Sequence, residues 1–246
     1  MRPTTFRRRK RQKQRKLDDV GDVGRLLAAE RELERTFVSE ALRLERAPNG
    51  WPVALICFHL AQWRERLGAA LLDFQAGHGY SQPEDVDEVN DREMPAGCDL
   101  PLGQTSVRAD QSLGELMALY ASLGEREFRW TTTFTTGDAI VRNSYFHPRV
   151  HIAAYWQQNR DERRAHQLIE NTVGELRELW PSPVILGAGL YNLATARVAQ
   201  GDCHSAIDLL DEAAPMRPDI VSHAHRDPDL AALRGDPRFE QLTAQA

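Results

Sequence analysis

Cysteine is scarce in this 246-residue chain: the three cysteines, Cys57, Cys98 and Cys203, are odd in number and lie far apart. Their scarcity argues against a disulfide framework and is typical of proteins of the reducing cytoplasm. Long hydrophobic runs are also missing, since the longest apolar stretch, VALICFHLA, is far too short to span a bilayer. We therefore expect a cytoplasmic protein without a membrane-spanning segment.

Acidic residues are absent from residues 1–16, MRPTTFRRRKRQKQRK, which hold nine Lys or Arg. Of the 31 Lys and Arg in the chain, 22 lie beyond this segment, against 36 Asp and Glu, so the rest of the chain carries a formal net charge of −14. The acidic charge of residues 17–246 argues against nucleic-acid binding except through residues 1–16. No apolar segment follows the basic residues, so they do not form a secretory signal.

We expect residues 1–19 to be a basic, disordered tail, because tails this short and poor in aromatic residues usually stay unstructured. Two alternatives remain open for this tail. One is contact with nucleic acid or an anionic membrane, and the other is translation from an upstream start codon.

Apolar residues recur at intervals of three and four, the spacing of one face of an α-helix. The first such pattern runs from Val23 to about Leu44. The second opens at an Asn-Gly turn signal and Pro52, and it continues through VALICFHLAQWRERLGAALLDF with His59 on its apolar stripe. We therefore expect His59 to face inward among apolar side chains.

Residues 77–110 form a long connection rich in Gly, Pro and Asp. Loops of this length inside a compact domain tend to be functional or mobile. Within this connection, VDEVNDREM predicts one short helical turn. The third helix is predicted to follow, with Asp110 or Ser112 as its N-cap.

Residues 131–143, TTTFTTGDAIVRN, contain β-branched residues, but the sequence offers them no partner strand. We therefore expect an extended connection there. The fourth helix is predicted to start near His147 and Pro148 and to continue through Arg163 into the 173–179 region.

WPSP at 180–183 ends the fourth helix and marks a domain boundary, because proline cannot continue a helix. Beyond it, residues 187–218 read as a helix, a Gly-Asp turn and a second helix. The predicted fold is therefore all-α: a four-helix bundle over residues 20–180, followed by a helical hairpin and tail over residues 184–246.

Three histidines are candidate metal ligands: His59, His147 and His151. Residues four apart lie on one face of a helix, about 6 Å apart, so His147 and His151 can converge on one ion, and Pro148 places His147 in the first turn of its helix. A divalent metal held by three imidazoles keeps open coordination positions, where chemistry takes place. The alternative is structural, with His59 a hydrogen-bonded core residue and the pair capping a helix. Possible partners that orient the imidazoles are Glu30, Glu34, Tyr155 and Gln158.

Three segments, WPVALICFHLAQWRERL, VDEVND and NSYFHPRVHIAAYW, together resemble the DinB-like superfamily of metal-binding helical bundles, over residues 20–175. That superfamily includes thiol-dependent S-transferases and the mycothiol-dependent maleylpyruvate isomerase. The resemblance implies that His59, His147 and His151 hold a divalent metal, Zn²⁺ or Ni²⁺. It also implies a low-molecular-weight thiol, such as mycothiol or bacillithiol, that is activated at the metal for attack on a small-molecule electrophile. No separate general base is evident, and Cys57, two residues from His59, is expected to point away into the core.

Residues 187–218 resemble a single tetratricopeptide repeat, and the matching positions are Leu193, Ala194, Gly201, Ala206, Leu210, Ala213 and Pro218. One such repeat cannot bury its own apolar face. It must therefore dock on the bundle, on a protein partner or on a second copy of itself. Two interpretations of the whole chain follow: a metal-dependent thiol S-transferase or isomerase, and a non-catalytic helical scaffold or adaptor that acts through residues 184–246.

Overall fold

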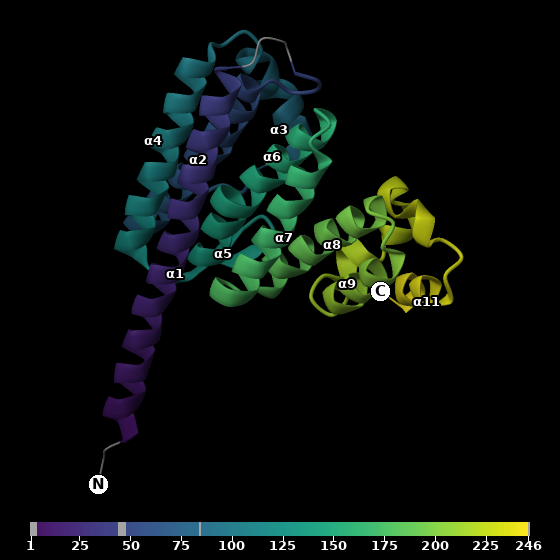
Figure 1. The fold of residues 1–246 in the computed structure, drawn as a ribbon. Coiled ribbons are helices and arrows are strands. Elements are labelled where there is room, and N and C mark those ends of the chain that lie inside the picture. Colours follow the sequence, from purple (N-terminus) through teal and green to yellow (C-terminus); the bar gives the residue numbers. More distant parts are fainter. Residues whose placement is uncertain (1–3, 44–47, 84, 246) are drawn as a thin grey trace. The chain divides into compact units, whose positions relative to one another are not determined.

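The computed structural model describes residues 4–43, 48–83 and 85–245, and within those ranges it describes side chains from Gly21 to Ala244. Helices make up almost all of its regular structure, which confirms the predicted all-α class (Figure 1). The chain divides into two compact units, Met1–His151 and Ile152–Ala246. This division falls within one helix, and the domain boundary predicted at 180–183 stays a prediction.

Four helical segments pack against one another in the first unit (Figure 1). They are α1 (Thr4–Ala41), α2 (Val53–Ala76), α4 (Leu102–Leu123), and a continuous run that comprises α5 (Thr136–Val141), the π-helical turn η2 (Arg142–Phe146) and the start of α6 (His147–Gln158). Burial of apolar side chains from all four segments stabilises the bundle. The fully buried ones include Leu26, Leu27, Leu67, Leu71, Leu113, Leu116, Ile140 and Tyr145.

The bounds of α1 include most of the segment that we expected to be a disordered basic tail, residues 1–19. The side chains of that segment lie outside the described residues, so its contact with nucleic acid stays a prediction. The buried face of α1 includes Val23, as the apolar spacing predicted, and the helix ends at Ala41.

The third helix of the bundle begins earlier than predicted. Helix α4 starts at Leu102, directly after Pro101, rather than at a cap formed by Asp110 or Ser112. Its first turns, LGQTSVRAD, have apolar side chains only at Leu102, Val107 and Ala109, so they carry only a weak apolar signal in the sequence. Proline and the residue after it are nevertheless well suited to the start of a helix.

The short helical turn predicted in VDEVNDREM is confirmed as α3 (Val86–Glu93). The carboxylate of Asp85 caps it, accepting hydrogen bonds from the backbone N–H groups of Asp87 and Glu88. The 3₁₀ turn η1 (Met94–Gly97) then leads towards α4. A Cβ atom at Gly97 would lie 2.3 Å from the ring of Phe58, so only glycine fits at this close approach to α2.

The extended connection predicted at 131–143 is wrong. Strand β1 (Glu127–Trp130) pairs antiparallel with β2 (Thr133–Thr135), and Thr131, with a φ of 49°, makes the tight turn between them. The partner strand, β1, was present in the sequence as EFRW, in which polar and aromatic residues alternate. Helix α5 follows at once, because the Thr135 hydroxyl accepts a hydrogen bond from the N–H of Asp138 and caps it.

The fourth helix starts at Thr136 and not near His147, and it does not continue through Arg163. It ends at Gln158, where Arg160 adopts a φ of 66°, and a separate helix, α7 (Glu162–Leu179), begins after the N-cap Asp161. A positive φ cannot continue an α-helix, and this turn carries no glycine or proline to mark it in the sequence.

The second unit contains the predicted helical hairpin, formed by α8 (Pro183–Ala199) and α9 (Cys203–Ala213) around Gly201, which has a φ of 81°. The short elements α10 (Pro218–Val221), η3 (Ala224–Arg226), η4 (Pro228–Leu233) and α11 (Pro237–Gln245) follow. They close over the apolar face of the hairpin in one core: Ala194, Ala206, Ile207, Leu210, Ala224, Leu230, Leu233 and Phe239. The end of the chain thus covers the face that a single repeat cannot bury alone.

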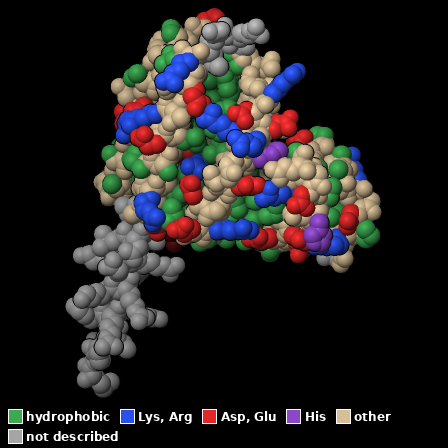
Figure 2. Space-filling view, in the orientation of Figure 1, with side chains coloured by type: hydrophobic (Ala, Val, Ile, Leu, Met, Phe, Trp, Pro, Cys, Tyr) green, Lys and Arg blue, Asp and Glu red, His purple; other side chains and the backbone are tan. Residues whose placement is uncertain are grey.

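Among the residues that the structure describes, no helix combines the length and the apolar character needed to cross a membrane. On the face drawn in Figure 2, acidic and basic side chains are interspersed rather than segregated. That face therefore offers no broad basic surface of the kind that binds a nucleic-acid backbone.

Candidate metal centre

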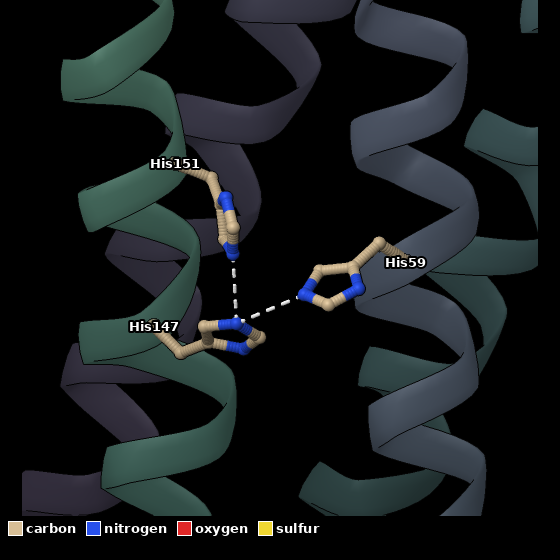
Figure 3. Close-up of side chains that lie close together, drawn as sticks. All are labelled: His59, His147 and His151. Atoms are coloured by element: carbon tan, nitrogen blue, oxygen red, sulfur yellow. Dashed lines mark hydrogen bonds between the residues drawn. The ribbon is translucent and has the colours of Figure 1, made fainter. Parts of the chain in front are cut away.

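His59 of α2 and His147 and His151 of α6 point towards one another in the first unit (Figure 3). The Nε2 atom of His147 lies 3.1 Å from Nε2 of His59 and 2.9 Å from Nε2 of His151. Candidate ligand atoms of the three rings all lie within 4.8 Å of one another. Among the described residues, no other group of three His, Cys, Asp or Glu side chains has this arrangement. The fold thus brings together all three histidines that the sequence singled out.

A π-helical turn sets the direction of the His147 side chain. The backbone N–H of His147 donates to the carbonyl oxygen of Arg142, five residues back, instead of four. Pro148 accounts for the irregularity, because proline has no N–H and its ring crowds the carbonyl oxygen four residues earlier in a regular helix. A wider turn relieves that crowding, and π-helical turns of this kind are frequent at functional sites.

Hydrogen bonds alone cannot explain the position of the three Nε2 atoms. A neutral imidazole nitrogen carries either one proton or one lone pair, so Nε2 of His147 can satisfy only one of its two Nε2 neighbours. A cation accepts the lone pairs of all three nitrogens at once. Two nitrogens that each lie about 2.1 Å from one ion are about 3.0–3.4 Å apart, close to the 2.9 and 3.1 Å found here.

Burial keeps the three imidazoles neutral. His59 is only 2% exposed, and desolvation, followed by repulsion from His151, lowers its pKa to about 3. Desolvation lowers the pKa of His151 to about 4, and it holds the pKa of His147 well below the usual value. An uncharged imidazole is the form that binds a metal, so all three rings are ready to coordinate at pH 7.

Two buried arginines on the histidine-bearing helices bind glutamates of α1. Nε of Arg149, the residue midway between the two histidines of α6, donates to Oε2 of Glu30 at 2.7 Å. Nη1 of Arg64 on α2 donates to Oε2 of Glu34 at 3.0 Å. All four side chains are buried. Burial and then repulsion from Glu34 raise the pKa of Glu30 to about 8, although Arg149 acts in the opposite direction.

Two of the four residues expected to orient the imidazoles act differently. Glu30 and Glu34 bind guanidinium groups rather than imidazole nitrogens, and the role expected for Tyr155 and Gln158 stays a prediction. Nδ1 of His59 is buried and has no hydrogen-bond partner among the described residues. The helices that carry the rings are held by the arginines, and the sequence motif HPRVH contains one of them.

Two tryptophans flank the histidines, and the sequence analysis missed both. The indole of Trp51 stacks on the ring of His151, with centroids 5.4 Å apart and planes at 13°, and meets His59 edge-on at 5.4 Å. Trp63 approaches His59 from one turn along α2, at 6.4 Å. The spacing of four between His59 and Trp63 was visible in the sequence, whereas Trp51 lies in a turn outside any helical pattern.

Cys57 lies in the core, as expected. Cys57 is buried, and desolvation raises the pKa of its thiol to about 12, so it is an inert core residue. The side chains of His78 and His204 are 71% and 80% exposed. Neither Cys57 nor these histidines belongs to the group of three.

Comparison with known proteins gives no assignment. No protein-family model matches the chain, and no curated protein and no solved structure matches it either. The resemblances to the DinB-like superfamily and to a tetratricopeptide repeat therefore stay proposals.

Proposed function

We propose that the first unit binds one divalent metal ion, Zn²⁺ or Ni²⁺, through Nε2 of His59, His147 and His151. One observation carries the proposal: three neutral ring nitrogens converge where hydrogen bonding can satisfy only one of the two short contacts. Imidazole ligands suit both zinc and nickel. Three ligands leave coordination positions open, which is the arrangement of a catalytic rather than a structural site.

We propose further that the chain is a metal-dependent enzyme that uses a low-molecular-weight thiol, as its resemblance to the DinB-like superfamily implies. A divalent ion at this position would lower the pKa of a thiol in an open coordination position and so supply a thiolate at neutral pH. The neutral histidines leave the full charge of the ion uncompensated, which favours an anionic ligand such as a thiolate. Such thiols belong to the cytoplasm, in keeping with the three free cysteines.

The metal proposal is tested by elemental analysis of the full-length chain after loading with Zn²⁺ or Ni²⁺ and removal of free ion. We expect one ion per chain, and loss of the ion in His59→Ala, His147→Ala and His151→Ala. His78→Ala is the matched control, because its exposed imidazole lies outside the group of three. A wild-type chain that retains no ion would refute the proposal.

The thiol proposal has a separate test. The chain is loaded with Co²⁺, whose bond to sulfur gives an intense charge-transfer absorption, and is then titrated with 2-mercaptoethanol. We expect a saturable sulfur-to-cobalt band at pH 7 that is missing when ethanolamine replaces the thiol. Binding of cobalt without such a band would leave the metal site intact and overturn the thiol chemistry.

A further inference from the structure

Trp51 lies in an unusual position for a large apolar side chain. The residue is 38% exposed, although its indole contacts two rings of a largely buried cluster. Local geometry holds it there: Gly50 has a φ of 72°, and Pro52 is the extended N-cap residue of α2. The carbonyl oxygen of Pro52 accepts hydrogen bonds from the N–H groups of Leu55 and Ile56, which ties the turn to the first turn of the helix.

Trp51 contacts two of the three candidate ligands, His59 and His151. The three Nε2 atoms form a triangle. His147 makes a short Nε2 contact with each of the other two rings, so no short contact joins His59 to His151. Trp51 contacts the rings of this pair, one face-on and one edge-on. His59 itself is almost fully buried, with Trp63 packed on its other flank. A ligand bound to an ion between these two rings would therefore lie close to Trp51, which is partly exposed.

The side chain of Trp51, which contacts both rings of this pair, is aromatic. The nearby guanidiniums that influence His147, Arg64 and Arg142, already bind Glu34 and the hydroxyl of Thr131. One face of the indole stacks on His151, and Trp51 as a whole is 38% exposed. Aromatic rings favour stacked or edge-to-face contact with other flat rings.

We infer that Trp51 is the specificity-determining residue of this site and that the substrate carries a flat, unsaturated or aromatic group next to the atom that meets the metal. The inference rests on the proposed metal function and goes beyond it by naming the class of substrate. The indole supplies the stacking surface, and the three histidines fix the ion at its edge. Saturated groups of the same size gain the apolar contact but lose the stacking geometry.

The test uses three hydroxamates that chelate a metal through the same group and differ only in their substituent. They are acetohydroxamate, benzohydroxamate and cyclohexanecarbohydroxamate, titrated into the full-length chain loaded with Ni²⁺. We expect benzohydroxamate to bind about three- to tenfold more tightly than the cyclohexane compound, the size of an aromatic stacking contribution. Trp51→Ala should abolish this difference, and Trp51→Phe should retain part of it.

Phe134→Ala is the matched control, since Phe134 is an exposed aromatic residue on strand β2, 60% exposed. The Phe134→Ala variant should keep the preference for benzohydroxamate over cyclohexanecarbohydroxamate. Elemental analysis of each variant distinguishes failure of the metal function from failure of the inference about Trp51. Absence of bound nickel in the wild-type chain refutes the metal function itself. Bound nickel with equal affinities for the flat and the saturated ring, or a preference that survives in Trp51→Ala, overturns the inference and leaves the metal function standing.

Discussion

Nε of Arg149 donates a hydrogen bond to Oε2 of Glu30 at 2.7 Å, although 119 residues separate the two in sequence. Four residues further along α1, Glu34 binds Arg64 in the same way. Residues four apart share one face of a helix, so a single face of α1 holds both helices that carry the histidines. We therefore expect these two contacts to hold α2 and α6 at the distance that brings the histidines together.

The contact between Arg149 and Glu30 predicts separable effects on stability and on metal binding. Glu30→Leu should lower the free energy of unfolding by about 3–5 kcal/mol, because it leaves a buried guanidinium without its carboxyl partner. Glu30→Leu with Arg149→Met removes both partners of the contact and should recover most of that loss. It should still weaken Zn²⁺ binding about tenfold, because the support of the histidine-bearing helix is gone. Denaturant unfolding and metal titration measure the two effects.

A control for this pair is Arg31→Met. Arg31 binds Asp110 of α4 at 2.6 Å, but both side chains are about one-third exposed, and exposed ion pairs contribute only about 0–1 kcal/mol. Metal affinity should not change in this variant. A double variant of Glu30 and Arg149 that folds and binds Zn²⁺ as tightly as the wild type would show that the contact does not position the histidines.

The histidine pKa values predict that the metal-free chain loses stability in mild acid. The pKa is lowered from 6.5 to about 3 at His59 and to about 4 at His151. Below about pH 6.5 the unfolded chain therefore binds protons that the folded chain does not. The contribution to stability is fully present above that pH and is lost as the pH falls towards 4. Urea unfolding between pH 7 and 4.5 measures it, and His151→Gln should reduce the slope; an unchanged slope in that variant would contradict the assignment.

Gly97 predicts a steric effect next to the metal site. A Cβ atom at this position would approach the ring of Phe58, the residue before His59, to 2.3 Å. Because Phe58 is only 4% exposed and has no room to move, Gly97→Ala should cost about 1–3 kcal/mol of stability by overpacking. Gly103→Ala in α4 is the control, since nothing lies within 4 Å of its Cβ position. Thermal unfolding of the two variants compares them, and equal midpoints would refute the predicted clash.

Phe239 tests whether the end of the chain covers the helical hairpin of the second unit. Its side chain is fully buried in the core that α8 and α9 share with the closing segments. Phe239→Ala should therefore destabilise this unit by about 3–5 kcal/mol. Hydrogen exchange of the amides in α8 and α9 reports the loss locally. Unchanged protection there would mean that the hairpin is stable without its C-terminal cover.

The all-α class and the inward position of His59 could be predicted because both depend on local apolar spacing, which the sequence displays directly. The start of the fourth helix could not, because the β-branched residues of TTTFTTGD conceal the cap at Thr135. The turn at Arg160 lacks the glycine that usually marks a positive φ. The contact of Arg149 with Glu30 and the stacking of Trp51 on His151 depend on tertiary packing, which no local pattern contains.

X-ray absorption spectroscopy of the full-length chain loaded with Zn²⁺ tests the central claim most directly, because it counts the imidazole ligands and measures their distances. We predict three imidazole nitrogens at about 2.1 Å from the ion, and fewer in the His59→Ala variant. A spectrum with one imidazole or none, or a chain that binds no stoichiometric metal, would contradict the account.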